Sequence, residues 1–262
     1  MTFYKNLFRS CGLCLLLVLL LPACKALAAD GYYYQIKVYH LKDKAQEDVL
    51  DAYLKDAYVP ALHKMGIKSV GVFKSLETDT AKRIYVFVPF KSLKDLNELD
   101  LKVFTATSAT DANKAYIDAS YKTPPYTRVE TIILSAFREM LTPALPNLTA
   151  PKAERIYELR SYEGATEKYY YNKVKMFNDG NEVGLFNRLG FNAVFYASVI
   201  AGSHMPNLMY MTTFNNKADR DKHWEAFSAD AEWKTLVAKP EYQNNVSHAD
   251  IIFLHPADYS DF

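Results

Sequence analysis

The chain has 262 residues, of which 50% are hydrophobic and 23% are charged. This proportion of apolar residues excludes an intrinsically disordered chain and suffices for one large domain or two small ones. Lys and Arg number 31 and Asp and Glu number 30, so the formal net charge is +1. That balance argues against a nucleic-acid-binding protein, which needs a net basic surface.

Residues 1–29 have the organisation of a secretory signal peptide. Lys5 and Arg9 precede an apolar stretch over 11–23, and Ala26-Leu27-Ala28 supplies the small residues of a cleavage site. The apolar stretch is too short to span a bilayer, which needs about 20 residues in a helix. We therefore expect an exported bacterial protein, periplasmic or secreted.

All three cysteines, Cys11, Cys14 and Cys24, lie within this first segment. The exported part would then contain neither a disulfide nor a reactive thiol. Leu21-Pro22-Ala23-Cys24 resembles a bacterial lipobox, in which Cys24 would carry the lipid anchor. Because proline is unusual at that place, we favour a soluble exported product and keep the lipoprotein as the alternative.

The rest of the chain repeats itself. Three pairs of segments match at an offset of 123 or 124 residues, namely 34–39 with 157–162, 66–70 with 190–194, and 84–87 with 208–211. Two copies of this length indicate a domain duplication and not a solenoid. We place the N-terminal copy at 30–141 and the C-terminal copy at 153–262. Three prolines lie in the linker between them, at 142–152.

Both copies show the same order of predicted elements. The first has a strand over 32–41, a helix over 49–65 that ends at Gly66, strands near 68–74 and 82–90, a helical region within 92–121 and a strand near 127–137. The second has a strand over 155–162, helices in 166–178 and 182–189, strands over 191–200 and 207–214, a helical stretch over 217–237 and a strand over 247–254. Pro60 should kink the first helix, since it lacks the N–H for an intrahelical hydrogen bond.

The order βαββαβ, found twice, is that of the ferredoxin-like unit. We therefore predict an α+β fold in which two tandem ferredoxin-like units close an intramolecular barrel of the dimeric α+β type. Alternation in the second copy gives one apolar face, which we expect beneath the helices. The opposite, mixed face would line the barrel cavity or meet solvent, and we assign to it Arg160, Tyr196, Tyr210, His248 and Asp250.

Several segments of the second copy resemble the NIPSNAP family. They are Arg155–Tyr162, Met205–Phe214, and His223-Trp224 with Phe227 and Glu232-Trp233. The resemblance is close over about 153–258 and looser over 32–137. It implies the dimeric α+β barrel superfamily, which agrees with the predicted elements. It implies no reaction, since the family has none agreed, and its mammalian members are associated with mitochondria and with protein partners.

Six residues are candidates for a ligand site. Arg160, on the same face as Tyr196 and Tyr210, would suit a carboxylate or phenolate ligand, and the alternative is an internal ion pair with Glu158. His248 and Asp250 would suit a general-base pair or half a metal site, and the alternative is an exposed polar pair. His204 lies at a hairpin tip, where the alternative is an ordinary turn.

The spacing of the histidines matches no metal-binding motif, so the sequence predicts no metal and no cofactor. We expect a module that binds a small anionic ligand or a protein partner, without nucleic acid and without a membrane span. Homo-oligomer formation stays open. The alternative is a cofactor-independent small-molecule enzyme of the α+β barrel superfamily, oxygenase-like or isomerase-like.

Overall fold

The structure is a computed structural model that describes residues 31–76, 82–108 and 113–262. The predicted signal peptide and Cys24 lie outside the described residues. Gly31–Phe262 forms one compact unit.

Eight strands form one closed antiparallel barrel in the order β1-β3-β2-β8-β5-β7-β6-β4. The strands are β1 (Tyr33–His40), β2 (Gly71–Ser75), β3 (Arg83–Phe90), β4 (Arg128–Ala136), β5 (Ile156–Glu163), β6 (Asn192–Ala201), β7 (Asn207–Phe214) and β8 (His248–Pro256). Each half contributes four neighbouring strands, and in each half the first and third strands lie between the fourth and the second. This is the strand order of a ferredoxin-like sheet, so the predicted fold is confirmed.

Two seams join the halves. At one seam β2 pairs with β8, from Phe73 opposite Pro256 to Ser75 opposite Leu254. At the other, β4 pairs with β6, with a register shift between Ile133 and Leu134. Each seam unites an outer strand of one half with an outer strand of the other. A sheet edge that would otherwise expose unpaired N–H and C=O groups is thereby closed.

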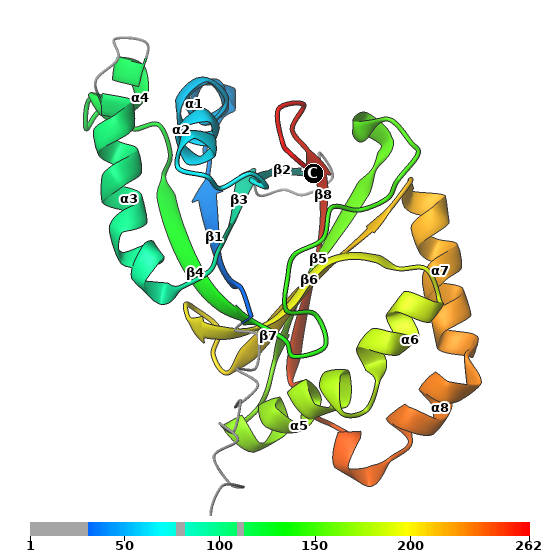
Figure 1. Cartoon of the computed structure of the whole chain (residues 1–262). Coiled ribbons are helices and arrows are strands. Elements are labelled where there is room, and N and C mark those ends of the chain that lie inside the picture. The colour runs from blue at the N-terminus through cyan, green and yellow to red at the C-terminus, as the bar shows by residue number, and fades with distance from the viewer. Residues whose placement is uncertain (1–30, 77–81, 109–112) are drawn as a thin grey trace, which may run out of the picture. The chain divides into compact units, whose positions relative to one another are not determined.

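Helices cover the outer face of each half (Figure 1). On the N-terminal half these are α1 (Lys44–Tyr53), α2 (Val59–Lys64), α3 (Leu93–Ser108) and α4 (Lys114–Ile117). On the C-terminal half they are α5 (Glu167–Asn178), α6 (Glu182–Arg188), α7 (Lys217–Ala229) and α8 (Ala231–Val237), with short 3₁₀ turns at Lys152–Glu154 and Pro240–Tyr242. No helix among the described residues has both the length and the apolar character needed to cross a membrane.

The predicted disturbance around Pro60 takes the form of a π-helical turn. Between α1 and α2, Leu54–Tyr58 forms a π-helix in which the Val59 N–H donates to the carbonyl of Leu54. Pro60 then occupies the first turn of α2, where a missing N–H costs little. One extra residue in the turn thus accommodates the proline without ending the helical stretch.

The apolar face of β5 and β7 fills the inside of the barrel, so our assignment of the two faces was inverted for these strands. Aromatic and aliphatic side chains from both halves form one cluster there, including Tyr34, Phe87, Phe195 and Leu159. The Tyr34 and Phe195 ring centroids are 5.3 Å apart, which joins the halves through a direct aromatic contact. The mixed face instead packs beneath the helices, where Tyr196 and Tyr210 belong to a separate outer cluster. The apolar inner faces of the two half-sheets are shielded from water because they pack against each other.

Register explains two further errors in the face assignment. On β6 a bulge between Ala193 and Phe195 reverses the alternation, so Phe195 points into the barrel although Ala193 belongs to the outer cluster. On β8, Asp250 lies opposite Ser161 and Ile251 opposite Arg160. Asp250 therefore lines the barrel end together with Ser161, and only its grouping with Arg160 was wrong.

Separating the halves should expose both seams and the shared interior. We expect residues 30–142 and 152–262, expressed alone, to be insoluble or to form homodimers that rebuild a barrel. Size-exclusion chromatography with light scattering would measure this. Two soluble monomers with native-like thermal transitions would contradict a barrel that depends on both seams.

Candidate functional sites

The predicted site residues separate into two places. Arg160, Tyr196 and Tyr210 lie between the C-terminal sheet and its helices, whereas His204, His248 and Asp250 lie at one end of the barrel. A third place, under the helices of the N-terminal half, emerges only from the structure.

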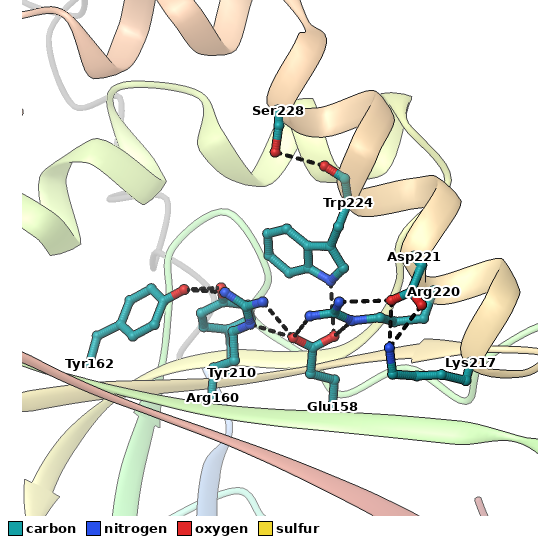
Figure 2. Close-up of polar contacts among 9 residues, drawn as sticks. All are labelled: Glu158, Arg160, Tyr162, Tyr210, Lys217, Arg220, Asp221, Trp224 and Ser228. Carbon is teal, nitrogen blue, oxygen red and sulfur yellow. Dashed lines mark hydrogen bonds and ion pairs between the residues drawn. The ribbon is translucent and has the colours of Figure 1, made fainter.

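Glu158 is the centre of the polar network under the C-terminal helices (Figure 2). It has no exposed surface, and its carboxylate accepts hydrogen bonds from Arg160 (Nε, 2.6 Å), Arg220 (Nε, 2.7 Å) and Trp224 (Nε1, 2.9 Å). Burial acts to raise the pKa of Glu158, but the hydrogen bond and charge of Arg220 and the charge of Arg160 outweigh it, so the pKa is lowered. The buried carboxylate therefore stays ionised and fully partnered.

The guanidinium group of Arg160 contacts Glu158, Tyr162 and Trp224. Its guanidinium carbon lies 3.7 Å from the centroid of the Trp224 ring, a cation–π contact. Its Nη1 donates to the Tyr162 hydroxyl at 2.7 Å, and that hydroxyl lies 2.9 Å from the Tyr210 hydroxyl. Tyr196 stacks on Tyr210 at a centroid distance of 5.6 Å. This is the internal ion pair that the sequence left open as the alternative to a ligand site.

Lys37, at the equivalent place in the first copy, has a simpler environment. It donates to Asp100 of α3 at 2.7 Å. Helices α3 and α7 begin 124 residues apart, at Leu93 and Lys217, which makes Asp100 the counterpart of Trp224. The small carboxylate of Asp100 thus stands where the other half has a large indole.

A pocket of about 440 Å³ occupies this part of the N-terminal half. We call it the tyrosine pocket, because six tyrosines line it together with Lys37, Asp100, Val103 and Phe104: Tyr39, Tyr53, Tyr58, Tyr116, Tyr121 and Tyr126. The Tyr53 and Tyr116 rings stack with centroids 3.8 Å apart and planes 2° from parallel. Small-molecule sites are commonly lined by aromatic side chains with a few polar groups among them.

The Tyr58 hydroxyl is buried in this wall and has no hydrogen-bond partner. Burial, with smaller effects of Asp100 and neighbouring tyrosines, raises the pKa of Tyr58 far above its ordinary value, so the hydroxyl keeps its proton. A buried hydroxyl without a partner costs free energy and is uncommon. The hydroxyl is therefore an unpartnered donor within the pocket wall, and a ligand group would have to enter the wall to accept its hydrogen bond.

The tyrosine pocket was missed from the sequence. Its walls come from β1, α1, the π-helical turn, α3, α4 and the segment before β4, so no motif joins them. One signal was available in the repeat itself, since aligning Asp100 with Trp224 shows a large side chain missing from the first copy.

The barrel end forms a second cavity, of about 270 Å³, which we call the barrel mouth. Both halves line it: Val38, His40, Arg83, Tyr85, Glu130 and Ile132 from one, and Ser161, Ser203, His204, Asn207, Met209, Asp250 and Ile252 from the other. His40 lies 2.8 Å from Glu130, and His204 lies 2.8 Å from Glu163. His248 is 3.2 Å from Asp250, which is the exposed polar pair considered from the sequence.

A larger groove, of about 790 Å³, lies along Met65–Ser69 and Pro89–Lys91. Lysines border it, but none of the buried, unpartnered side-chain atoms of the described residues belongs to its lining. It therefore shows fewer features of a specific ligand site than the two smaller cavities.

The NIPSNAP family model matches residues 157–261. The C-terminal half is a NIPSNAP domain. The match includes β5 with Glu158 and Arg160 as well as α7 with Arg220 and Trp224, so the whole buried network belongs to this NIPSNAP domain. The tyrosine pocket lies outside the matched residues, and no curated protein matches the chain.

Three solved structures share the barrel over most of its length. A monooxygenase candidate from Fusobacterium nucleatum has 9% identity and a TM-score of 0.57, with 87% of this chain and 93% of the other covered. A second monooxygenase candidate, from Lactobacillus acidophilus, has 12% identity and a TM-score of 0.54, with coverages of 87% and 94%. An anthrone oxidase-like protein has 8% identity and a TM-score of 0.52, with coverages of 88% and 93%. At these identities the likeness establishes the fold.

Replacing Arg160 should destabilise the protein without opening a ligand site. In Arg160→Met, the buried carboxylate of Glu158 keeps only Arg220 and Trp224 as partners. We expect a loss of about 3 kcal/mol in the free energy of unfolding, at the lower end of the range for a broken buried ion pair because Arg220 remains. Chemical denaturation measures this.

Arg188→Met is the matched control, since Arg188 forms a half-exposed ion pair with Asp230 on the surface. It should change stability little. An Arg160→Met protein as stable as the wild type would contradict a structural role for the network.

Proposed function

We propose that the chain is an exported protein that binds a flat aromatic molecule in the tyrosine pocket. The single observation that carries this proposal is the contrast between the halves: the space that Trp224 and Arg160 fill beneath α7 is open beneath α3, with Lys37, Asp100 and the unpartnered Tyr58 hydroxyl around it. The space between sheet and helices is thus filled by an ion-pair network in one copy of the fold and open in the other.

The pocket indicates the chemistry of its ligand. Stacked tyrosine rings favour an aromatic ring, and the Tyr58 hydroxyl favours an oxygen acceptor on it. Lys37 can attract a carboxylate or phenolate if the ligand's anionic group replaces its contact with Asp100. The volume of about 440 Å³ lies in the range of ordinary small-molecule sites. Native mass spectrometry of protein isolated from its own compartment would identify a retained ligand.

Filling the pocket should abolish binding. Asp100→Trp places in the N-terminal half the side chain that its counterpart Trp224 has, and the indole should occupy the space of the ligand. With 8-anilinonaphthalene-1-sulfonate as an aromatic anionic probe, we expect the directly excited probe fluorescence to fall to the level of a non-binding protein. Tyr58→Phe should weaken binding without loss of stability, because the lost hydroxyl has no partner.

Leu101→Trp is the matched control, since it adds the same indole one residue further along α3 on an exposed position outside the pocket lining. It should bind the probe as the wild type does. Equal probe binding by Asp100→Trp and Leu101→Trp would contradict the proposal.

An enzyme acting on the bound aromatic molecule is the second candidate. It draws support from the names of the structural neighbours, two monooxygenase candidates and an anthrone oxidase-like protein. Oxygen uptake by wild-type protein with its retained ligand, absent in Asp100→Trp, would favour the enzyme over the binding module.

The export part of the proposal rests on Lys5, Arg9 and the apolar segment that follows them. We expect the intact mass of the protein from a bacterial host to correspond to a chain that begins near Asp30. A mass that corresponds to a chain beginning at Cys24 with an attached lipid would establish the lipoprotein instead. An uncleaved chain in the cytoplasm would contradict export.

A further inference from the structure

We propose that the barrel mouth binds one divalent transition-metal ion through Glu163, His204 and Asp250. These residues each offer one ligand atom, and the three atoms lie within 4.8 Å of one another. One imidazole nitrogen with two carboxylate oxygens is a donor set that suits Zn²⁺, Fe²⁺ or Mn²⁺. No other group of this kind occurs among the described residues.

The ends of three neighbouring strands hold these ligands in place. Glu163, the last residue of β5, lies opposite Asn207 of β7 on one side and His248 of β8 on the other. Its carbonyl accepts the Ser247 N–H at 2.8 Å, which fixes the backbone at this point. His204 comes from the β6–β7 hairpin and already lies 2.8 Å from the Glu163 carboxylate. The ligands therefore need only small side-chain movements to surround an ion.

Asn207 gives independent evidence of a missing partner. Its side chain is 3% exposed and lines the same cavity as His204 and Asp250. The amide nitrogen donates to the Ser161 hydroxyl at 2.8 Å, but the amide oxygen has no hydrogen-bond partner. A buried carbonyl oxygen next to a metal site can ligate the ion or accept a hydrogen bond from a water that the ion holds.

The charges around the mouth favour a cation. Glu130, Glu163 and Asp250 place three carboxylates there, against the one guanidinium of Arg83. Glu130 lies 2.8 Å from His40 through one oxygen and accepts a hydrogen bond from the Ser203 hydroxyl at 3.4 Å through the other. Asp250 lies 3.2 Å from His248 through one oxygen, which leaves its second oxygen for an ion. An excess of negative charge in a concave site concentrates cations. This site is separate from the tyrosine pocket, and its occupancy does not depend on the proposed function.

Zn²⁺ titration of the metal-stripped protein, prepared without a polyhistidine tag, tests the proposal. By isothermal titration calorimetry we expect one ion per chain, and Zn²⁺ should raise the melting temperature because it binds the folded state. Asp250→Asn and His204→Gln should each lower the affinity about tenfold or more. Both residues lie on accessible surface, so circular dichroism and thermal unfolding without metal should match the wild type.

His63→Gln is the matched control. His63 lies 2.8 Å from Asp261 in a histidine–carboxylate pair that belongs to no three-ligand group among the described residues. This variant should bind Zn²⁺ as the wild type does. The proposal is overturned if the wild type binds no Zn²⁺, or if Asp250→Asn and His204→Gln retain the wild-type affinity.

Discussion

Closure of the sheet is the constraint on which the rest of this structure depends. Each half has an apolar sheet face that must be shielded from water and two outer strands whose backbone N–H and C=O groups need partners. The helices of the same half cover the opposite sheet face, so they meet neither need. Pairing β2 with β8 and β4 with β6 closes the edges, and the same step brings Tyr34 against Phe195 inside the barrel. Since aromatic side chains fill the interior, the tyrosine pocket lies beneath the helices and the barrel mouth lies at one end of the barrel.

The two halves pair the cation on the helix-covered sheet face in different ways. In the C-terminal half, Arg160 and Arg220 share one ionised carboxylate and Trp224 covers the first guanidinium. In the N-terminal half, Gln35 stands at the place of Glu158, and Lys37 reaches outward to Asp100 on α3. Because the N-terminal half has no counterpart of the Glu158 carboxylate or the Trp224 indole, space remains beneath α3, and tyrosine rings line that space.

The sequence predicted the repeat, the order of the elements and the barrel, because each depends on local periodicity and on matched segments. It did not predict which face points inward. Both faces of β5 contain apolar residues, and a single bulge after Ala193 or a one-residue change in the register of β8 reverses the assignment. For the same reason Asp250 was placed with Arg160 and not with Glu163 and His204. Metal ligands from two strands and a hairpin have no sequence spacing to detect, so the absence of a motif could not decide the question.

Because both copies belong to one chain, each barrel contains one N-terminal half and one C-terminal half, which can differ in sequence. In a barrel made from two identical subunits, every substitution occurs twice, so a pocket opened beneath one set of helices would open beneath the other as well. Here Asp100 and Trp224 can differ, because a covalent connection through the segment before Lys152 abolishes that symmetry. Each barrel therefore has the tyrosine pocket in one half and the ion-pair network around Glu158 in the corresponding place of the other. A symmetric relative would present two equivalent pockets, between which cooperativity could arise, whereas the tyrosine pocket here has no equivalent partner within the chain.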